Sequence, residues 1–182
     1  MARLYLVRNA RTEEGTGFGE NPGLDEVGLV QAEAVAGLLG GRPRMPILCS
    51  PQRRALETAS PLARHWSCSP MIDNAVTLMP LPDSNACDVL SWLTMFMQSS
   101  WCDAPAAQNR WREDCLSRLL NLSGDSVVVS HFIVVNMIAG AAMGDDRVTV
   151  FQPDNGSITI VDVVNGNLTL VELGREAATR RL

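Results

Sequence analysis

Polar side chains follow three apolar stretches of the chain, at the points where buried strands are expected to end. Because the carboxyl ends of parallel strands meet at one edge of a sheet, these side chains are expected to gather there. Guanidinium groups and a helix N-terminus both suit phosphate oxygens, so the pattern predicts a site for an anion, in particular a phosphate monoester. The residues concerned are Arg8 and Asn9 after 4–7, Ser50 after 45–49, and Ser130 and His131 after 126–129.

Two further arginines, Arg53 and Arg54, fall in the first turn of the helix expected after Ser50, which brings two or three guanidiniums to this edge. Each residue also has a structural interpretation. An arginine after a strand can be a surface salt-bridge partner, and a histidine at a helix start can be a cap or a core hydrogen-bonding group. Arg53 is expected to be the more solvated of its pair.

The elements that must position these residues alternate along the chain. The run Leu4–Val7 is continuously apolar, which is typical of a strand covered on both faces. Asp25 is expected to cap a helix that ends at Gly40-Gly41. Its apolar positions recur at helical spacing: Val27, Val30, Ala34, Leu38 and Leu39. The second strand is predicted at 45–50, and Pro51 is expected in the first turn of a helix that runs to about residue 66.

The second half of the chain continues this alternation. It predicts a strand at 71–78, an apolar helical stretch within 80–103, a helix from about 105 to 122, a strand at 126–130 and a helix to about 143. Asn165-Gly166 between two β-rich runs predicts a C-terminal hairpin. We therefore expect one α/β domain over 1–182, a three-layer α/β/α fold with a mostly parallel sheet and an antiparallel C-terminal edge.

Composition excludes several classes of protein. The net charge is −5, so non-specific nucleic-acid binding is not expected, and no apolar run is long enough to cross a membrane. The first residues turn polar too soon for a signal peptide. Five scattered cysteines without a CxxC pair favour reduced thiols in a cytoplasmic protein. Two histidines without clustered ligands give no metal site, and nothing indicates a cofactor.

Four segments taken together resemble the histidine phosphatase superfamily, which is phosphoglycerate mutase-like. "LYLVRNART" resembles a strand that ends in an Arg-His-Gly triplet, and "LDEVGLVQAEAVAGLL" resembles the first helix with its Gly-x-x-Gln-Ala core. "CSPQRRALETA" resembles the segment that supplies a pocket arginine, which falls on Arg54. "VVVSHF" resembles the second histidine motif, which falls on His131. The segments occur in the family's order and span nearly the whole chain.

The resemblance implies roles for these residues. In the family, the histidine of the first triplet is the nucleophile and forms a phosphohistidine. Two arginines and the second histidine bind the phosphoryl group, which here implies Arg8, Arg54 and His131. An acidic residue beyond the third strand protonates the leaving oxygen.

Two positions depart from this pattern. Asn9 stands at the nucleophile position, and its amide nitrogen is a very poor nucleophile because the lone pair is delocalised. The proton donor aligns near "VTLMPLP", which has no carboxyl, and Asp83 is the nearest acid. The smaller change to Phe132, where the family usually has glycine, is expected to narrow the pocket.

Several functions stay open on this evidence. The leading hypothesis is an intact phosphate pocket with an impaired phosphohistidine route. Asn9 is either natural or a His-to-Asn change in an active phosphatase. The rivals are a phosphatase that activates water through Asp83 or His131, and a non-catalytic ligand-binding or structural subunit, for instance a homodimer paired through the edge hairpin. Residues 80–111 are expected to form a lid-like insertion whose aromatic side chains pack mainly as core.

Overall fold

The fold is built on a mixed sheet, described by a computed structural model that covers residues 1–13, 21–82 and 86–178. Its strands lie in the order β3-β2-β4-β1-β5-β6. The pairs β1–β4, β2–β4 and β2–β3 are parallel, and β1–β5 and β5–β6 are antiparallel. The bounds are β1 Ala2–Arg8, β2 Ile47–Cys49, β3 Met71–Ile72, β4 Ser126–Ser130, β5 Ile158–Val164 and β6 Asn167–Glu172.

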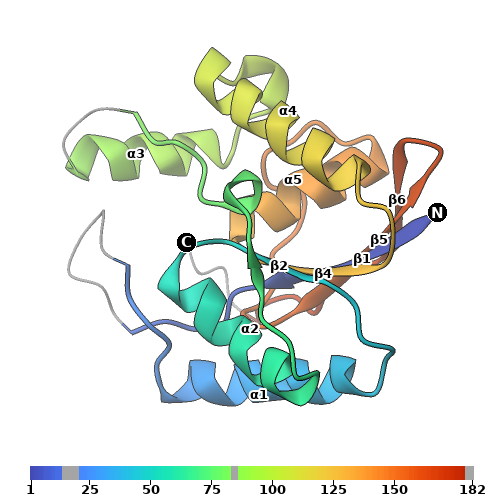
Figure 1. Ribbon diagram of the computed structural model, residues 1–182. Helices are drawn as coiled ribbons and strands as arrows, with labels where there is room; N and C mark the ends of the chain where they lie inside the picture. Colours follow the sequence, from blue (N-terminus) through green and yellow to red (C-terminus); the bar gives the residue numbers. More distant parts are fainter. Residues whose placement is uncertain (14–20, 83–85, 179–182) are drawn as a thin grey trace.

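Helices cover both faces of this sheet (Figure 1). Two of them, α1 and α2, lie on one face, and α3, α4 and α5 lie on the other. Their bounds are α1 Glu26–Gly40, α2 Arg53–His65, α3 Ala86–Phe96, α4 Ala106–Leu120 and α5 Phe132–Met143, with short 3₁₀ turns η1 Asn74–Val76 and η2 Trp101–Asp103. The predicted three-layer α/β/α fold with an antiparallel C-terminal edge is confirmed.

Alternation along the central strands divides the core into two clusters. Tyr5 and Val7 of β1 belong to the cluster under α1 and α2. Leu4 and Leu6 point the other way and join the cluster that contains Leu119 of α4. Because both faces are buried, the strands read as continuous apolar runs, as the sequence predicted. Phe96 and Trp101 are buried in this second cluster, so these aromatic side chains do pack as core.

Two local expectations were wrong, and the spacing in α1 did not reveal its buried face. The strand predicted at 71–78 is two residues long, because the Asp73 carboxylate accepts from the N–H of Ala75 (3.0 Å) and turns the chain into η1. Pro51 precedes α2 rather than lying in its first turn, since Gln52 is the N-cap. The apolar positions that recur at helical spacing in α1 face outward except for Leu39. The buried face is instead formed by a second set: Gly28, Ala32, Val35, Ala36 and Leu39.

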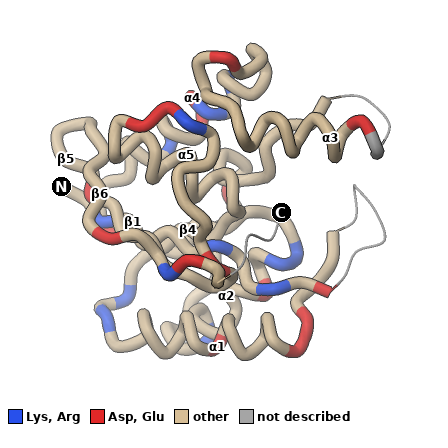
Figure 2. Tube along the Cα trace, turned by 180° about the vertical axis from the view of Figure 1, so that it is seen from behind, with Lys and Arg blue, Asp and Glu red and all other residues tan. Residues whose placement is uncertain are grey.

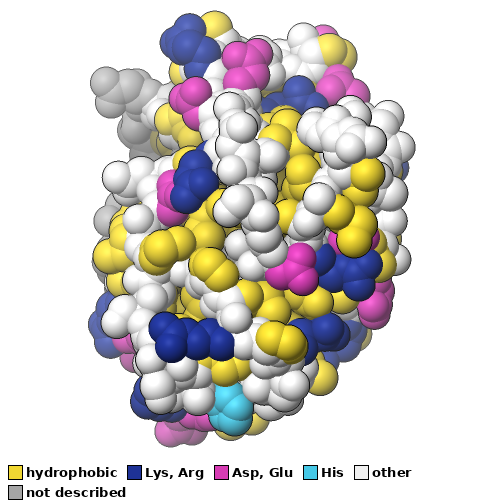
Figure 3. All heavy atoms as spheres, turned by 45° about the vertical axis from the view of Figure 1, so that its right-hand side comes forward, with side chains coloured by type: hydrophobic (Ala, Val, Ile, Leu, Met, Phe, Trp, Pro, Cys, Tyr) yellow, Lys and Arg dark blue, Asp and Glu magenta, His cyan; other side chains and the backbone are white. Residues whose placement is uncertain are grey.

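The surface combines apolar and charged groups. Figure 3 shows one face on which hydrophobic side chains reach the surface between arginines and acidic residues. Within the described ranges, no helix has the length and apolar character needed to span a membrane. Cys49, Cys68, Cys102 and Cys115 are free thiols.

Candidate functional site

The end of β1 sets the position of Asn9. The N–H of Asn9 donates to the Ser130 carbonyl (2.8 Å), which continues the β1–β4 pairing beyond the strand. The Asn155 amide donates to the Asn9 carbonyl (2.9 Å) from the turn that precedes β5. Asn9 is buried, and its Nδ2 donates to the carbonyl of Ala10 (3.0 Å). The Asn9 Oδ1 is therefore left to face His131.

His131 lies between two side chains that reach it from β1 and β2. Its Nδ1 is 3.1 Å from the Asn9 Oδ1, and its Nε2 is 2.7 Å from the Ser50 Oγ. Because the Asn9 oxygen can only accept, Nδ1 carries the proton, and the Ser50 hydroxyl donates to Nε2. The pattern fixes the tautomer of the neutral ring, and the charge of the ring is decided by its surroundings. Although the Ser50–His131–Asn9 chain has the order of a nucleophile, base and orienting group, Ser50 is fully buried and acts only to orient the ring.

Burial and charge keep His131 neutral. Burial, the largest cause, and the positive charges of Arg54 and Arg8 together lower the pKa of His131 from its usual 6.5 to about 3. The charges of both guanidiniums lower the pKa of the ring, and Asn9 and Ser50 contact the ring directly. The sequence prediction that β1, β2 and β4 deliver their polar residues to one edge is therefore consistent with the structure.

Arg8 is held in place by the loop before β5. Its guanidinium donates to the Pro153 carbonyl (2.6 Å) and lies over the Phe132 ring, 5.1 Å from the centroid. Burial lowers the pKa of Arg8. The negative charge of the Asp154 carboxylate acts in the opposite direction and raises this pKa, but its effect is the smaller of the two. Asp154 itself pairs with Arg175 (2.9 Å). Arg8 is thus a half-buried cation whose hydrogen bond is to a neutral carbonyl.

Arg54 is the second cation of the site, at the start of α2. The Thr58 hydroxyl donates to the Arg54 carbonyl (2.6 Å) and accepts from the Ala10 N–H (2.9 Å), which ties α2 to the segment after β1. Burial lowers the pKa of Arg54. Within the described ranges, its guanidinium has no salt bridge and no hydrogen bond. A half-buried guanidinium without a carboxylate is suited to an anionic ligand.

Other predicted residues lie apart from this site. Arg53 points to solvent and pairs with Glu57 (2.7 Å), as expected of the more solvated arginine. The Ser130 hydroxyl donates to the Val76 carbonyl (2.6 Å) and contributes to the fold rather than to the site. Asp83, the candidate acid, lies outside the described residues.

Sequence reasoning missed two residues that hold the site together, Thr58 and Asn155. Thr58 belongs to the segment "CSPQRRALETA", where the resemblance gave a role to Arg54 alone. Asn155 lies in "PDNG" (153–156), a turn signal that could have marked a close approach to the strand ends. Contacts of this kind join segments far apart in the chain, which spacing alone does not reveal.

The resemblance motif Gly-x-x-Gln-Ala also gains a physical explanation. A Cβ at Gly28 would come 1.9 Å from the Arg11 carbonyl oxygen, so only glycine fits there. One turn later, the Gln31 Oε1 accepts from the Arg11 N–H (2.8 Å). The motif thus holds the segment after Asn9 against α1.

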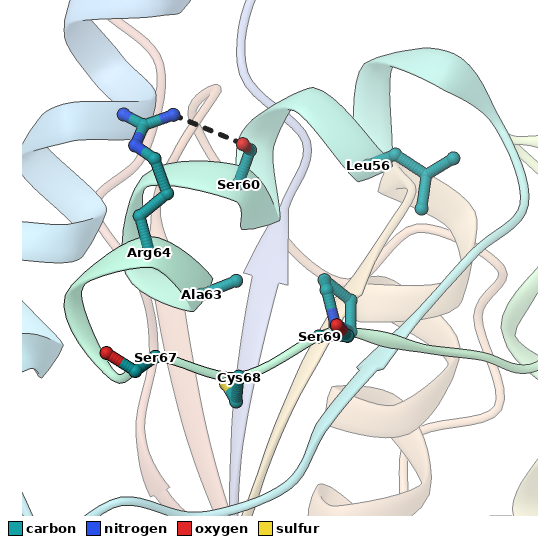
Figure 4. Close-up of a pocket in the computed structure, with 8 residues that line it drawn as sticks. Leu56, Ser60, Ala63, Arg64, Ser67, Cys68 and Ser69 are labelled. Atoms are coloured by element: carbon teal, nitrogen blue, oxygen red, sulfur yellow. Dashed lines mark hydrogen bonds between the residues drawn. The ribbon is translucent and has the colours of Figure 1, made fainter.

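A surface hollow of about 480 Å³ lies elsewhere, at the C-terminal half of α2 (Figure 4). Arg64 there donates to Ser60 (3.2 Å) and to Glu33 (2.8 Å), so its charge is already paired. The hollow is separate from the cationic site, which is at the other end of α2. Across the residues that the structure describes, no group of three or more His, Cys, Asp or Glu side chains could hold a metal.

Comparison with known proteins identifies the family of this chain. The model of the histidine phosphatase superfamily (branch 1) matches residues 4–77. A glucosyl-3-phosphoglycerate phosphatase from Mycobacterium tuberculosis is 31% identical over 167 residues, covering 86% of this chain and 71% of the relative. The chain belongs to the histidine phosphatase superfamily. A glucosyl-3-phosphoglycerate phosphatase from Mycolicibacterium vanbaalenii is 28% identical over 166 residues, covering 86% of this chain and 70% of that protein.

Solved structures show that the superfamily fold extends over nearly the whole chain. A mycobacterial glucosyl-3-phosphoglycerate phosphatase superposes with a TM-score of 0.76 at 19% identity, covering 97% of this chain and 100% of that one. YhfR from Bacillus stearothermophilus superposes with a TM-score of 0.76 at 19% identity, covering 94% of this chain and 96% of YhfR. The superfamily match at 4–77 contains Arg8, Asn9, Ser50 and Arg54, whereas His131 lies beyond it.

Proposed function

We propose that this superfamily member binds a phosphate monoester through Arg8, Arg54 and His131, and that Asn9 impairs turnover through a phosphohistidine. The observation that carries the proposal is a pair of half-buried guanidiniums whose charges both lower the pKa of His131, and neither is paired with a carboxylate within the described ranges. Such a pair favours a ligand with two negative charges, because unpaired buried cations are costly.

The class of ligand follows from the charge and from the relatives. The substrate that names the mycobacterial relatives, glucosyl-3-phosphoglycerate, is a phosphate monoester of a small polar molecule. We propose a ligand of that class for this chain. Phe132 under the Arg8 guanidinium supplies an apolar wall beside the phosphate position.

Impaired turnover rests on the chemistry of Asn9. An amide nitrogen does not attack phosphorus at neutral pH, and the Asn9 side chain is already engaged with His131 and the Ala10 carbonyl. His131 cannot replace the missing nucleophile from where it lies, since both its ring nitrogens are hydrogen-bonded to protein groups. The site therefore keeps the elements of phosphate binding and lacks the group that would form a covalent intermediate.

The segment from 80 to 111 is proposed to border this site as a lid-like insertion within a single domain. Gln108 supports this arrangement, because its side-chain amide donates to the Pro80 carbonyl (2.8 Å) and brings the two ends of the segment together. The α3 helix lies between these ends and stands out from the rest of the fold (Figure 1).

Binding is tested by thermal unfolding with phosphate or vanadate. A ligand at 100 times its Kd stabilises by about 2.7 kcal/mol, which raises the Tm of a chain of this size by about 5–10 °C. Arg54→Ala should abolish the shift. Arg53→Ala is the matched control, because Arg53 is the adjacent residue and pairs on the surface with Glu57. If neither anion shifts the Tm, or both variants lose the shift equally, the proposed pocket is wrong.

Turnover is tested by restoring histidine with Asn9→His and measuring hydrolysis of an aryl phosphate. We expect a gain of several orders of magnitude, each worth about 1.4 kcal/mol in the barrier. A wild-type protein that already turns over at the rate of Asn9→His, and loses that activity with Arg8→Ala, would be a working phosphatase that activates water directly.

A further inference from the structure

Helix α1 is apolar on two opposite faces, and the monomer covers only one of them. The outward face carries Val27, Val30, Ala34, Gly37 and Leu38, with Val30 and Leu38 exposed to 70% and 68%. These positions follow one another at helical spacing and include no charged residue. A helix that is apolar all round is normally covered on both sides, and a continuous exposed apolar face marks an interaction surface.

Apart from Glu33, which pairs with Arg64 of α2, the charged residues of α1 and its flanks lie at the two ends of the helix. Glu26 begins the helix, and Arg42 and Arg44 follow its C-terminus, so one end is acidic and the other basic (Figure 2). Neither Glu26 nor Arg44 forms a salt bridge in the part of the chain that the structure describes. An apolar face between opposite charges is complementary to a second copy of itself that runs in the opposite direction.

We propose that two copies of this chain associate through the outward faces of α1, arranged antiparallel about a two-fold axis at Ala34. In this register, Val30 of one copy packs on Leu38 of the other, and Val27 packs beside Gly41. Glu26 of each copy then lies opposite the segment 42–44 of its partner. The contact is isologous, as a two-fold axis requires, because each residue pair occurs twice.

Small residues allow the two helices to approach. Ala34 lies at the axis, and a Cβ added at Gly37 or Gly41 would meet no atom within 4 Å in the monomer. Glu33 and Arg64, which pair across α1 and α2 (2.8 Å), border the apolar face and provide a polar rim. These features favour a second copy over an unrelated partner, since one surface supplies both complementary sides.

The size of the surface sets the strength of the contact. A 15-residue helix is about 22 Å long, so one helix pair buries less than the roughly 800 Å² per partner of a standard interface. The dimer is therefore concentration-dependent. Its formation is independent of the proposed function, because this face of α1 points away from the sheet and the anion site lies at the strand ends.

Sedimentation velocity from about 5 to about 500 µM tests the inference. We expect the mass to rise with concentration from 19.7 kDa toward twice that value. Val30→Glu should weaken association by about 100-fold, since it buries two like charges near the axis. Met95→Glu is the control, because Met95 is equally apolar and exposed (73%) but lies on α3. A wild-type protein that stays monomeric at every concentration overturns the inference.

The register and the rival interface are tested separately. Glu26→Arg and Arg44→Glu should each weaken the dimer, and the double variant should restore it; failure of the restoration overturns the antiparallel register. Val171→Lys, on the edge strand β6, tests pairing through the C-terminal hairpin. A dimer that dissociates with Val171→Lys and persists with Val30→Glu would place the interface at β6 and overturn the proposal.

Discussion

Acidification should destabilise the protein through His131, before most carboxylates titrate. The pKa of His131 is about 3 in the folded chain and near 6.5 when the side chain is in water. Between these values the unfolded chain binds more protons than the folded one. The contribution of His131 is therefore fully present above about pH 6.5 and is lost as the pH falls toward 3.

The size of the effect follows from the two pKa values. From pH 7 to pH 4.5, this single group should lower the free energy of unfolding by about 2.5 kcal/mol. Other groups add to the total at lower pH, since hydrogen bonds from backbone or arginine groups lower the pKa of Asp25, Asp145 and Asp162. The quantity to measure is therefore the difference in pH dependence between the wild type and His131→Gln.

Urea unfolding at several pH values measures this difference, and NMR titration of the histidine rings checks its cause. His65→Gln is the matched control, because it removes the chain's other histidine, which is exposed at the end of α2. We expect His131 to stay neutral at pH 4.5, and bound phosphate to raise its pKa by offsetting the charges of Arg8 and Arg54. A His131 ring that titrates near pH 6.5 without ligand, or a His131→Gln variant with the wild-type pH dependence, would refute the reasoning.

Three further changes probe how the site and core are held. Thr58→Val should cost about 1–3 kcal/mol in urea unfolding, because it leaves the buried N–H of Ala10 without an acceptor. Asn136→Ala should cost about 2 kcal/mol or more by the same measurement, since the Asn136 Oδ1 accepts from two backbone N–H groups of the loop beyond α5. Leu119→Ala should cost about 2–5 kcal/mol as a core cavity, whereas exposed Leu38→Ala should stay within about 0.5 kcal/mol in dilute solution.

Local pattern was sufficient to predict the sheet and most of the helices. The β1 and β4 strands are buried on both faces, so their sequences are apolar throughout, and Asn165-Gly166 fits a turn with positive φ at both residues. The short β3 could not be predicted in this way. Its ending depends on the Asp73 side chain bonding to Ala75, which is a choice between two local hydrogen-bond patterns that the sequence leaves open.

The periodicity of apolar residues could not predict which face of α1 packs against the sheet, for a different reason. The helix presents two apolar faces, and the pattern Val27–Val30–Ala34–Leu38 is the more regular of the two. The face that packs inward is decided by size, because Gly28 must lie against the Arg11 carbonyl and leaves no room for a side chain. A search for large apolar residues therefore selects the outward face.

The candidate site likewise has features that the sequence predicts and features that depend on contacts between distant segments. Arg8, Asn9 and His131 could be placed at the sheet edge from sequence, because each ends or directly follows a strand and the ends of parallel strands converge. The protonation state of His131 could not be predicted, since it depends on Ser50, on Asn9 and on two guanidiniums brought from separate elements.

Asn9 has a second effect beyond the loss of a nucleophile. Its oxygen accepts the Nδ1 proton of His131, so the same residue that removes the covalent route also fixes the ring proton of its neighbour on Nδ1. Asn9→His should therefore change both properties together: it removes the carbonyl acceptor from His131 while it supplies a nitrogen nucleophile, and the His131 ring resonances should shift in the same variant that gains turnover.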